Sequence, residues 1–213
     1  MNALILVDLQ YDFMPGGALA VTDGDQVVAV ANRLIPHVEM VVATQDWHPA
    51  RHMSFASQHE GRSVGEVVQL DGLDQVLWPD HCIQGTPGAE LHKDLDTQQI
   101  HQVVRKGTNI RIDSYSGFFD NGHRQATELA TLLRQSGVTE VAVMGLATDY
   151  CVKFTALDAV ELGLNTTLIN DGCRGVDLNA GDVDRSVDDM QVAGVRLVAS
   201  DQWINELIRT TRD

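Results

Sequence analysis

Short, continuously apolar runs recur along the whole chain, and each one ends at a polar residue or a turn. A run that is apolar at every position, rather than at alternate positions, is typical of a strand covered on both faces, as in a parallel sheet. The predicted strands span residues 2–7, 40–44, 102–105, 138–144, 166–169 and 195–198.

Segments with apolar residues at helical spacing lie between these runs. Val27, Val28, Ala31 and Leu34 follow a 3.6-residue period that ends at Pro36. The same spacing predicts four more helices, which begin near Ala126, Lys153, Asn179 and Ser200, with Asn179 and Ser200 as N-caps. Such an alternation predicts an α/β fold of three layers, in which a largely parallel six-stranded sheet carries helices on both faces.

Residues 47–100 interrupt the alternation with a long stretch of weak periodicity. A segment of that length without strong elements is either functional or disordered, and its histidines and tryptophans favour a function. A short hairpin is predicted near residues 63–70. We therefore expect one domain over residues 1–213, with a long loop insertion at about 47–100 that contributes a metal site.

Composition narrows the class of protein. The chain has 213 residues, of which 44% are hydrophobic, and no apolar run approaches the length of about 20 residues that spans a bilayer. A formal net charge of −15 argues against nucleic acid or an anionic membrane as the main partner. The three cysteines, Cys82, Cys151 and Cys173, are widely spaced and odd in number, which favours a reducing, cytoplasmic setting without disulfides.

Cys151 occupies a position with chemical consequences. The segment Gly145–Val152 lies between a predicted strand and a predicted helix, which places Cys151 in or near the first helical turn. Unpaired N–H groups and the helix dipole favour a thiolate there, and the same N–H groups can hold an oxyanion. A buried free cysteine is more often structural, so the position alone leaves both interpretations open.

Three charged residues end predicted strands. In open parallel sheets ligands bind beyond the carboxyl ends of the strands, so Asp8, Asp46 and Lys106 should converge with Cys151 on one edge. Asp8 is the candidate base, because partial burial after an apolar strand should raise the pKa of its carboxyl group. Lys106 would oppose that rise and hold Asp8 in place. A purely structural Asp8–Lys106 ion pair is the alternative.

The segment Asp46-Trp47-His48 has a spacing suited to metal binding. Side chains at positions i and i+2 of an extended segment can reach one ion, and His81, or His52 in addition, could complete the set. One carboxylate with two or three imidazoles suits one divalent transition metal per chain, with Zn²⁺ as the leading candidate and Fe²⁺ or Mn²⁺ as alternatives. The competing interpretation is that these are solvated loop histidines.

Phe13 and Trp78 are loop aromatics that fall on no helical or strand face. They either cover the edge of the core or form flat walls for a planar ring.

Five motifs together resemble a known family. They are VDLQYDF at 7–13, TQDWHP at 44–49, WPDHCIQGTPG at 78–88, RKG at 105–107 and GLATDYCV at 145–152. The chain resembles the nicotinamidases, also called pyrazinamidases, of the isochorismatase-like cysteine hydrolases. The resemblance covers essentially the whole chain, and the motifs are highly specific in combination.

The resemblance implies roles for individual residues. It implies a catalytic triad of Asp8, Lys106 and Cys151, and a metal held by Asp46, His48 and His81, with His52 as a less favoured fourth ligand. It also implies a cis peptide bond just before Ala147, an oxyanion hole formed by the amides of Ala147 and Cys151, and a substrate ring flanked by Phe13 and Trp78.

The implied activity is hydrolysis of nicotinamide, a small molecule, to nicotinate and ammonia through a cysteine thioester, for NAD salvage. Pyrazinamide is expected to be a second substrate. Two alternatives stay open: another cysteine amidase of the superfamily, acting on an N-carbamoyl or ureido substrate, and a non-catalytic metal-binding module. A vinyl-ether hydrolase would give Cys151 no task, and no G-x-G-x-x-G motif follows the first strand to suggest a dinucleotide enzyme. The sequence makes no prediction of the oligomeric state.

Overall fold

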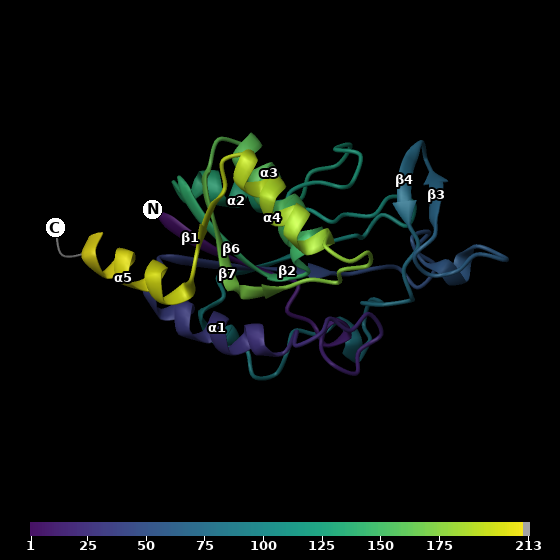
Figure 1. Cartoon of the computed structure of the whole chain (residues 1–213), viewed down its shortest axis with the longest axis horizontal. Coiled ribbons are helices and arrows are strands. Elements are labelled where there is room, and N and C mark those ends of the chain that lie inside the picture. Colours follow the sequence, from purple (N-terminus) through teal and green to yellow (C-terminus); the bar gives the residue numbers. More distant parts are fainter. Residues whose placement is uncertain (211–213) are drawn as a thin grey trace.

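A single six-stranded sheet forms the centre of the computed structural model, which describes residues 1–210 (Figure 1). The strand order is β5-β2-β1-β6-β7-β8, and every neighbouring pair is parallel, so the predicted parallel sheet is confirmed. The strands are β1 (Asn2–Val7), β2 (Met40–Asp46), β5 (Gln102–Lys106), β6 (Glu140–Leu146), β7 (Asn165–Arg174) and β8 (Arg196–Val198).

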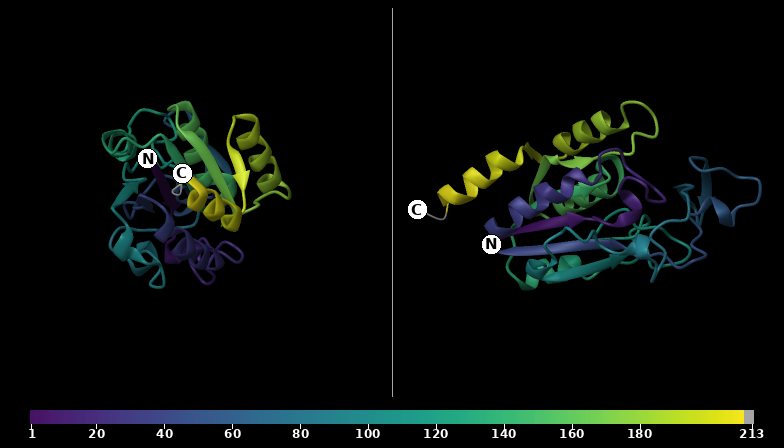
Figure 2. Two further views of the ribbon diagram at one scale, coloured as in Figure 1. Left: turned by 90° about the vertical axis from the view of Figure 1, so that its left-hand side faces the viewer. Right: turned by 90° about the horizontal axis from the view of Figure 1, so that it is seen from below.

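Helices cover both faces of the sheet, as the alternation predicted. One face carries α1 (Gln26–Leu34) and α5 (Ser200–Thr210), which lie together in front of the sheet in the right-hand view of Figure 2. The opposite face carries α2 (Leu129–Gln135), α3 (Lys153–Glu161) and α4 (Asp182–Val192) (Figure 1). The result is the expected three-layer arrangement.

The two-sided cover explains the continuous apolar pattern of the central strands. All residues of β2 are buried, as are all of β1 after Asn2 and all of β6 after Glu140. The register places Val7 beside Gly145, and Asp46 beside Lys106. The residues at and just beyond the carboxyl ends of β1, β2, β5 and β6 therefore meet at one edge of the sheet.

Two predicted boundaries are wrong by three residues or more. β7 continues to Arg174 instead of ending near Ile169, because a register shift between Val143 and Gly145 lets it pair further along β6. α2 begins at Leu129 rather than near Ala126, since Ala126 forms an isolated bridge with Phe119.

The two predicted N-caps are also wrong. Gly181 is the N-cap of α4, and the backbone N–H of Asn179 instead donates to Asp182 Oδ2 at 2.9 Å. Ser200 is the first residue of α5, and its hydroxyl donates to Asp171 Oδ2 at 2.5 Å. In both cases the expected cap instead donates a hydrogen bond to an aspartate.

The insertion between β2 and β5 contains little regular structure. Its hairpin is formed by β3 (Val67–Leu70) and β4 (Leu73–Val76), so the prediction near residues 63–70 is misplaced. The turn residues Asp71 and Gly72 both have positive φ, 51° and 84°, as a two-residue hairpin turn requires. Three short 3₁₀ helices, Ala56–Gln58, Pro87–Ala89 and Thr97–Gln99, complete the segment.

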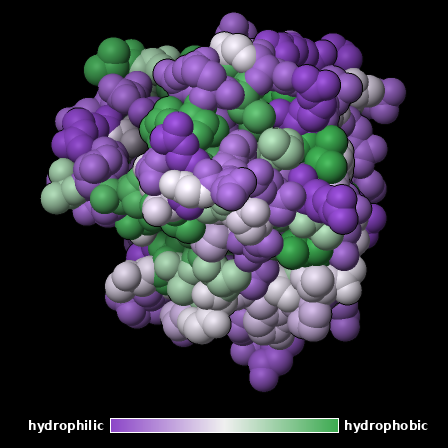
Figure 3. All heavy atoms as spheres, turned by 90° about the vertical axis from the view of Figure 1, so that its right-hand side faces the viewer, coloured by the Kyte–Doolittle hydropathy of each residue, from purple (hydrophilic) through white to green (hydrophobic). Residues whose placement is uncertain are grey.

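The surface shows no continuous apolar band on the face that carries the hairpin. Hydrophobic residues form separate patches there among hydrophilic ones (Figure 3). Within residues 1–210, no helix is long and apolar enough to cross a membrane. All three cysteines are buried and free, which agrees with the prediction that they form no disulfide.

Candidate active site

Asp8, Lys106 and Cys151 meet at the carboxyl edge of the sheet, as their positions at strand ends predicted. Lys106 Nζ lies 2.8 Å from Asp8 Oδ2 and 3.4 Å from Cys151 Sγ. All three residues are buried. Side-chain atoms of Asp8, Asp46 and Cys151 lie within 4.8 Å of one another. A carboxylate, an ammonium group and a thiol thus share one water-poor cluster.

Asp8 is held in a conformation suited to proton transfer. It directly follows β1 with a left-handed backbone (φ 52°), and Thr44 Oγ1 donates a hydrogen bond to its Oδ1 at 2.6 Å. Burial raises the pKa of Asp8 to about 6, against the opposing charge of Lys106. The predicted direction of this pKa shift is confirmed. A carboxyl group with that pKa can both accept and return a proton near neutral pH.

The thiol of Cys151 differs from the sequence-based expectation. Residues Thr148–Val152 form a π-helical turn that leads into α3, so the cysteine does lie at a helix start. However, burial raises the pKa of Cys151 well above its ordinary value, although Lys106 acts to lower it. The predicted preference for a thiolate is therefore wrong for the resting site, because loss of solvation outweighs the charge of Lys106. The thiol needs a base.

The peptide bond between Leu146 and Ala147 is cis, as the resemblance implied. The backbone N–H of Ala147 has no hydrogen-bond acceptor among residues 1–210. This N–H, next to the π-helical turn that carries Cys151, is available to a ligand oxygen.

Asp46, His48 and His81 form a compact group beside the thiol. Asp46 Oδ2 lies 3.5 Å from His48 Nε2 and 3.9 Å from His81 Nε2. The Nδ1 atoms of the two imidazoles contact backbone carbonyls, that of His48 at Gly107 (2.9 Å) and that of His81 at Pro79 (2.8 Å). These contacts leave both Nε2 atoms for a metal, which is how metal-binding histidines are usually oriented. His48 Nε2 is buried without a hydrogen-bond partner, as expected of an atom that binds a metal.

The electrostatics of this group suit a cation. Burial acts to raise the pKa of Asp46, but Lys106 and His48 hold it well below its ordinary value. Burial acts to lower the pKa of His48, yet the charge of Asp46 raises it to about 9. The pKa of His81 is lowered to about 4 by burial. Asp46 is thus an anion at neutral pH that attracts positive charge to the imidazoles.

His52 belongs to a neighbouring group. Its Nδ1 lies 2.7 Å from Ser54 Oγ, and its Nε2 is buried without a hydrogen-bond partner. Side-chain atoms of His48, His52 and Asp113 lie within 4.8 Å of one another, whereas the group of Asp46, His48 and His81 does not include His52. Asp113 was not among the predicted site residues.

A small pocket connects the thiol, the metal-type group and the aromatic residues. Its free volume is about 20 Å³. The predicted residues that line it are Phe13, Asp46, Trp78, His81, Ala147 and Cys151. Tyr115 and Tyr150 also line it and were not predicted: Trp78 Nε1 donates to the Tyr115 hydroxyl at 3.0 Å, and the rings of Trp78 and Tyr150 are 4.7 Å apart and nearly perpendicular.

Two further residues hold the site together. The side-chain amide of Gln10 accepts from the backbone N–H of Asp46 and donates to the carbonyls of Asp46 and Ala89, each at 2.8 Å. A Cβ on Gly107 would lie 2.4 Å from the imidazole of His48, and its φ is +63°, so a side chain there would displace the histidine. Both residues fall within the sequence motifs, which was the available signal.

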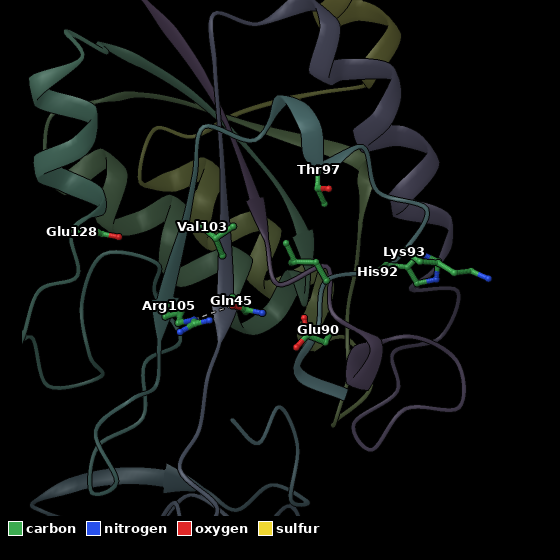
Figure 4. A pocket seen from close by; sticks show the side chains of 9 residues that line it. Gln45, Glu90, His92, Lys93, Thr97, Val103, Arg105 and Glu128 are labelled. Carbon is green, nitrogen blue, oxygen red and sulfur yellow. Dashed lines mark hydrogen bonds between the residues drawn. The ribbon is translucent and has the colours of Figure 1, made fainter. Parts of the chain in front are cut away.

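A larger groove lies elsewhere on the molecule. Its volume is about 770 Å³, and Gln45, His92, Arg105 and Glu128 are among the residues that line it (Figure 4). Arg105 Nε donates to Gln45 Oε1 at 3.3 Å. The groove contains none of the predicted site residues, so cavity size alone does not identify the reactive site.

Comparison with known proteins agrees with this fold. The chain belongs to the isochorismatase family, since the model of the isochorismatase domain matches residues 2–202. It is 54% identical to nicotinamidase of Escherichia coli (strain K12), over 95% of this chain and 96% of that protein. Its structure resembles that of a nicotinamidase/pyrazinamidase from Acinetobacter baumannii with a TM-score of 0.92 and 45% identity, over 95% and 97% of the two chains. A pyrazinamidase of Pyrococcus horikoshii, solved in complex with zinc, matches with a TM-score of 0.76 and 38% identity, over 93% and 98%.

Proposed function

We propose that this chain is a cytoplasmic nicotinamidase, which hydrolyses nicotinamide to nicotinate and ammonia for NAD salvage and also accepts pyrazinamide. The proposal rests on one pocket. It is lined by the thiol of Cys151, by the candidate metal ligands Asp46 and His81, and by the aromatic rings of Phe13 and Trp78. Proteins named nicotinamidase match this chain over nearly their full length, which supports the same activity.

The first half of the reaction forms a thioester. Asp8 takes the thiol proton of Cys151, and the sulfur attacks the carboxamide carbon, so that the carbonyl π electrons move onto oxygen. The backbone N–H groups of Ala147 and Cys151 donate to this oxyanion. When the tetrahedral species collapses, the C–N bond breaks and Asp8 returns its proton to the leaving nitrogen, which departs as ammonia. Lys106 contacts both Asp8 and Cys151 and holds their side chains in place during the reaction.

The second half releases the acid. Asp8 is now a carboxylate and removes a proton from a water molecule that attacks the thioester carbon. The same two N–H groups hold the second oxyanion. Collapse breaks the C–S bond, and the proton on Asp8 returns to Cys151 Sγ, which restores the resting thiol and frees nicotinic acid, which ionises to nicotinate in water. A base with a pKa of about 6 suits this alternation between acceptor and donor.

We infer that Asp46, His48 and His81 hold one divalent transition metal, with His52 as a candidate further ligand. Zn²⁺ suits one carboxylate with imidazoles best, and Fe²⁺ or Mn²⁺ also fit. A bound ion would supply a Lewis acid that binds and orients the ring nitrogen of the substrate. The chain's own part is to present both Nε2 atoms and one carboxylate oxygen toward the same point.

Substrate entry requires side chains to move. A volume of about 20 Å³ accommodates roughly one water molecule and no aromatic ring. We infer that side chains that line the pocket, Trp78 and Tyr150 among them, shift to admit the ring.

Ammonia release from a panel of amides tests the activity. We expect rapid release from nicotinamide and pyrazinamide, and little from an N-carbamoyl amino acid or biuret. The reverse ranking would overturn the proposal in favour of another cysteine amidase of the family. Release from none of them would favour a non-catalytic metal-binding module.

A further inference from the structure

Asp113 is a buried carboxylate without an ionic partner. It lies between β5 and α2, where its Oδ1 accepts from the N–H of Ser114 at 2.7 Å and its Oδ2 from Gln75 Nε2 at a long 3.4 Å. Among residues 1–210, no lysine, arginine or histidine nitrogen lies within 4.0 Å of it. A buried carboxylate normally needs an opposite charge or several good hydrogen bonds.

Another buried carboxylate in the same loop is stabilised by several backbone hydrogen bonds. Asp120 accepts three backbone N–H groups, from Gly122, Arg124 and Gln125, at 2.9–3.0 Å. Asp113 accepts one backbone N–H, so most of its negative charge is not stabilised by hydrogen bonds.

The buried charged groups around Asp113 also leave negative charge without a partner. Lys106 is the only buried lysine or arginine in the described part of the chain, and it already contacts Asp8 and Asp46. When the imidazoles are neutral, as histidines that bind a metal are, the three carboxylates of Asp8, Asp46 and Asp113 share one ammonium group, which leaves two formal negative charges in excess. A divalent cation supplies the missing charge.

The geometry places Asp113 at the metal group. Its carboxylate lies more than 4.0 Å but no more than 4.8 Å from the nearest ring nitrogens that His48 and His52 offer. Two ligands on opposite sides of one ion are separated by about 4.2 Å, since metal–ligand bonds are about 2.1 Å long. Gly107 engages His48 Nδ1, which leaves Nε2 for a metal, and Asp113 lines the same pocket as Asp46 and His81.

We propose that Asp113 is a second carboxylate of the metal centre, which faces the ion together with His52 and balances its charge. The inference rests on the metal centre proposed above and extends it by one residue. The competing role for Asp113 is structural: with Gln75 it would only support Tyr115, to whose hydroxyl Gln75 Nε2 also donates at 3.1 Å.

Metal affinity separates these roles. The probe is Mn²⁺, which prefers oxygen and nitrogen over thiolate and so avoids competition from the cysteines. The affinity of the chelator-treated chain is measured from the EPR signal of free Mn²⁺, for the wild type, Asp113→Asn and the matched control Asp120→Asn. We expect Asp113→Asn to bind about 10- to 100-fold more weakly, as for other residues that support metal ligands. Asp120→Asn should bind as the wild type does, whatever it loses in thermal stability.

A charge-retaining variant keeps the test decisive if Asp113→Asn folds poorly. Asp113→Glu should bind Mn²⁺ more tightly than Asp113→Asn, because it keeps the negative charge. The proposal would be overturned if a folded Asp113→Asn bound Mn²⁺ as tightly as the wild type. It would also be overturned if Asp113→Glu bound Mn²⁺ as weakly as Asp113→Asn. Absence of Mn²⁺ binding by the wild type would overturn the metal centre as well, and the ammonia assay on the untreated protein would still judge the nicotinamidase activity separately.

Discussion

The two halves of the site are built in different ways. Asp8 and Lys106 stand at the ends of parallel strands, where the ladder register sets their positions. His48 and His81 lie in irregular loops, where hydrogen bonds from Nδ1 to the carbonyls of Gly107 and Pro79 orient them. Asp8 and Lys106 are therefore held as rigidly as the sheet, whereas the two histidines of the metal half depend on a few loop contacts. The third residue of the metal half, Asp46, is the last residue of β2. Substitutions in the first half should change the rate, and those in the second should change the metal content.

The largest effect is expected from Cys151→Ala. This variant should fold and bind ligand but lose turnover by a factor on the order of 10⁶, because the attacking sulfur is gone. Cys173→Ser is the matched control, since Cys173 is equally buried at the carboxyl edge and its thiol donates to the carbonyl of Ile169. Steady-state ammonia release and a melting curve check both variants. Measurable turnover by Cys151→Ala, or an inactive but folded Cys173→Ser, would contradict the assignment of the nucleophile.

Asp8→Asn should reduce turnover by about 100- to 10,000-fold, the usual contribution of a positioned base. The amide keeps the shape of the side chain, so the melting temperature should show a retained fold. Near-wild-type ammonia release from this variant would move the base to another residue.

His48→Ala tests the loop half of the comparison. The variant should bind metal more than about 100-fold more weakly, or lose it during purification, because it removes one of three grouped ligand atoms, and loss of an outer-shell partner alone typically costs about 10- to 100-fold. His59→Ala is the control: this histidine lies in the same insertion, and its Nε2 contacts the carbonyl of Met53 instead. Elemental analysis of both variants gives the answer, and an unchanged metal content in His48→Ala would remove that residue from the metal site.

A smaller, graded effect is expected from pH. Because burial raises the pKa of Asp8 to about 6, the carboxylate that accepts the thiol proton is present above that pH and is lost as the pH falls below it. The value of kcat/KM should therefore fall about tenfold per pH unit below 6. In Asp8→Asn this acid limb should be absent, and a limb at the same pH in both proteins would assign it to a different group.

The sequence predicted the sheet half well and the loop half incompletely, for physical reasons. Buried parallel strands leave a continuous apolar pattern, and their register brings Asp8, Asp46 and Lys106 to one edge. Asp113 lies in a polar loop without periodicity, so nothing local distinguishes it from a solvated residue. Only the folded chain shows that it is buried next to His48 and His52.

The remaining errors have a common cause, which is that tertiary contacts override local signals. Ser200 has the side chain of a good cap, but its hydroxyl donates to Asp171 from a distant strand. Cys151 lies at a helix start that favours a thiolate, but burial reverses the expected direction of its pKa. The hairpin is the exception, because its Asp71-Gly72 turn was readable in the sequence.

The most direct test combines both halves of the site in one assay. Ammonia release from nicotinamide is measured for the protein as purified, after complete removal of metal by a chelator, and after metal is restored, with Cys151→Ala as the blank. We predict that activity disappears with the metal, returns when the metal is restored, and is absent from the blank throughout. Full activity in the metal-free protein would contradict a substrate-binding role for the metal, and activity in Cys151→Ala would contradict the cysteine mechanism itself.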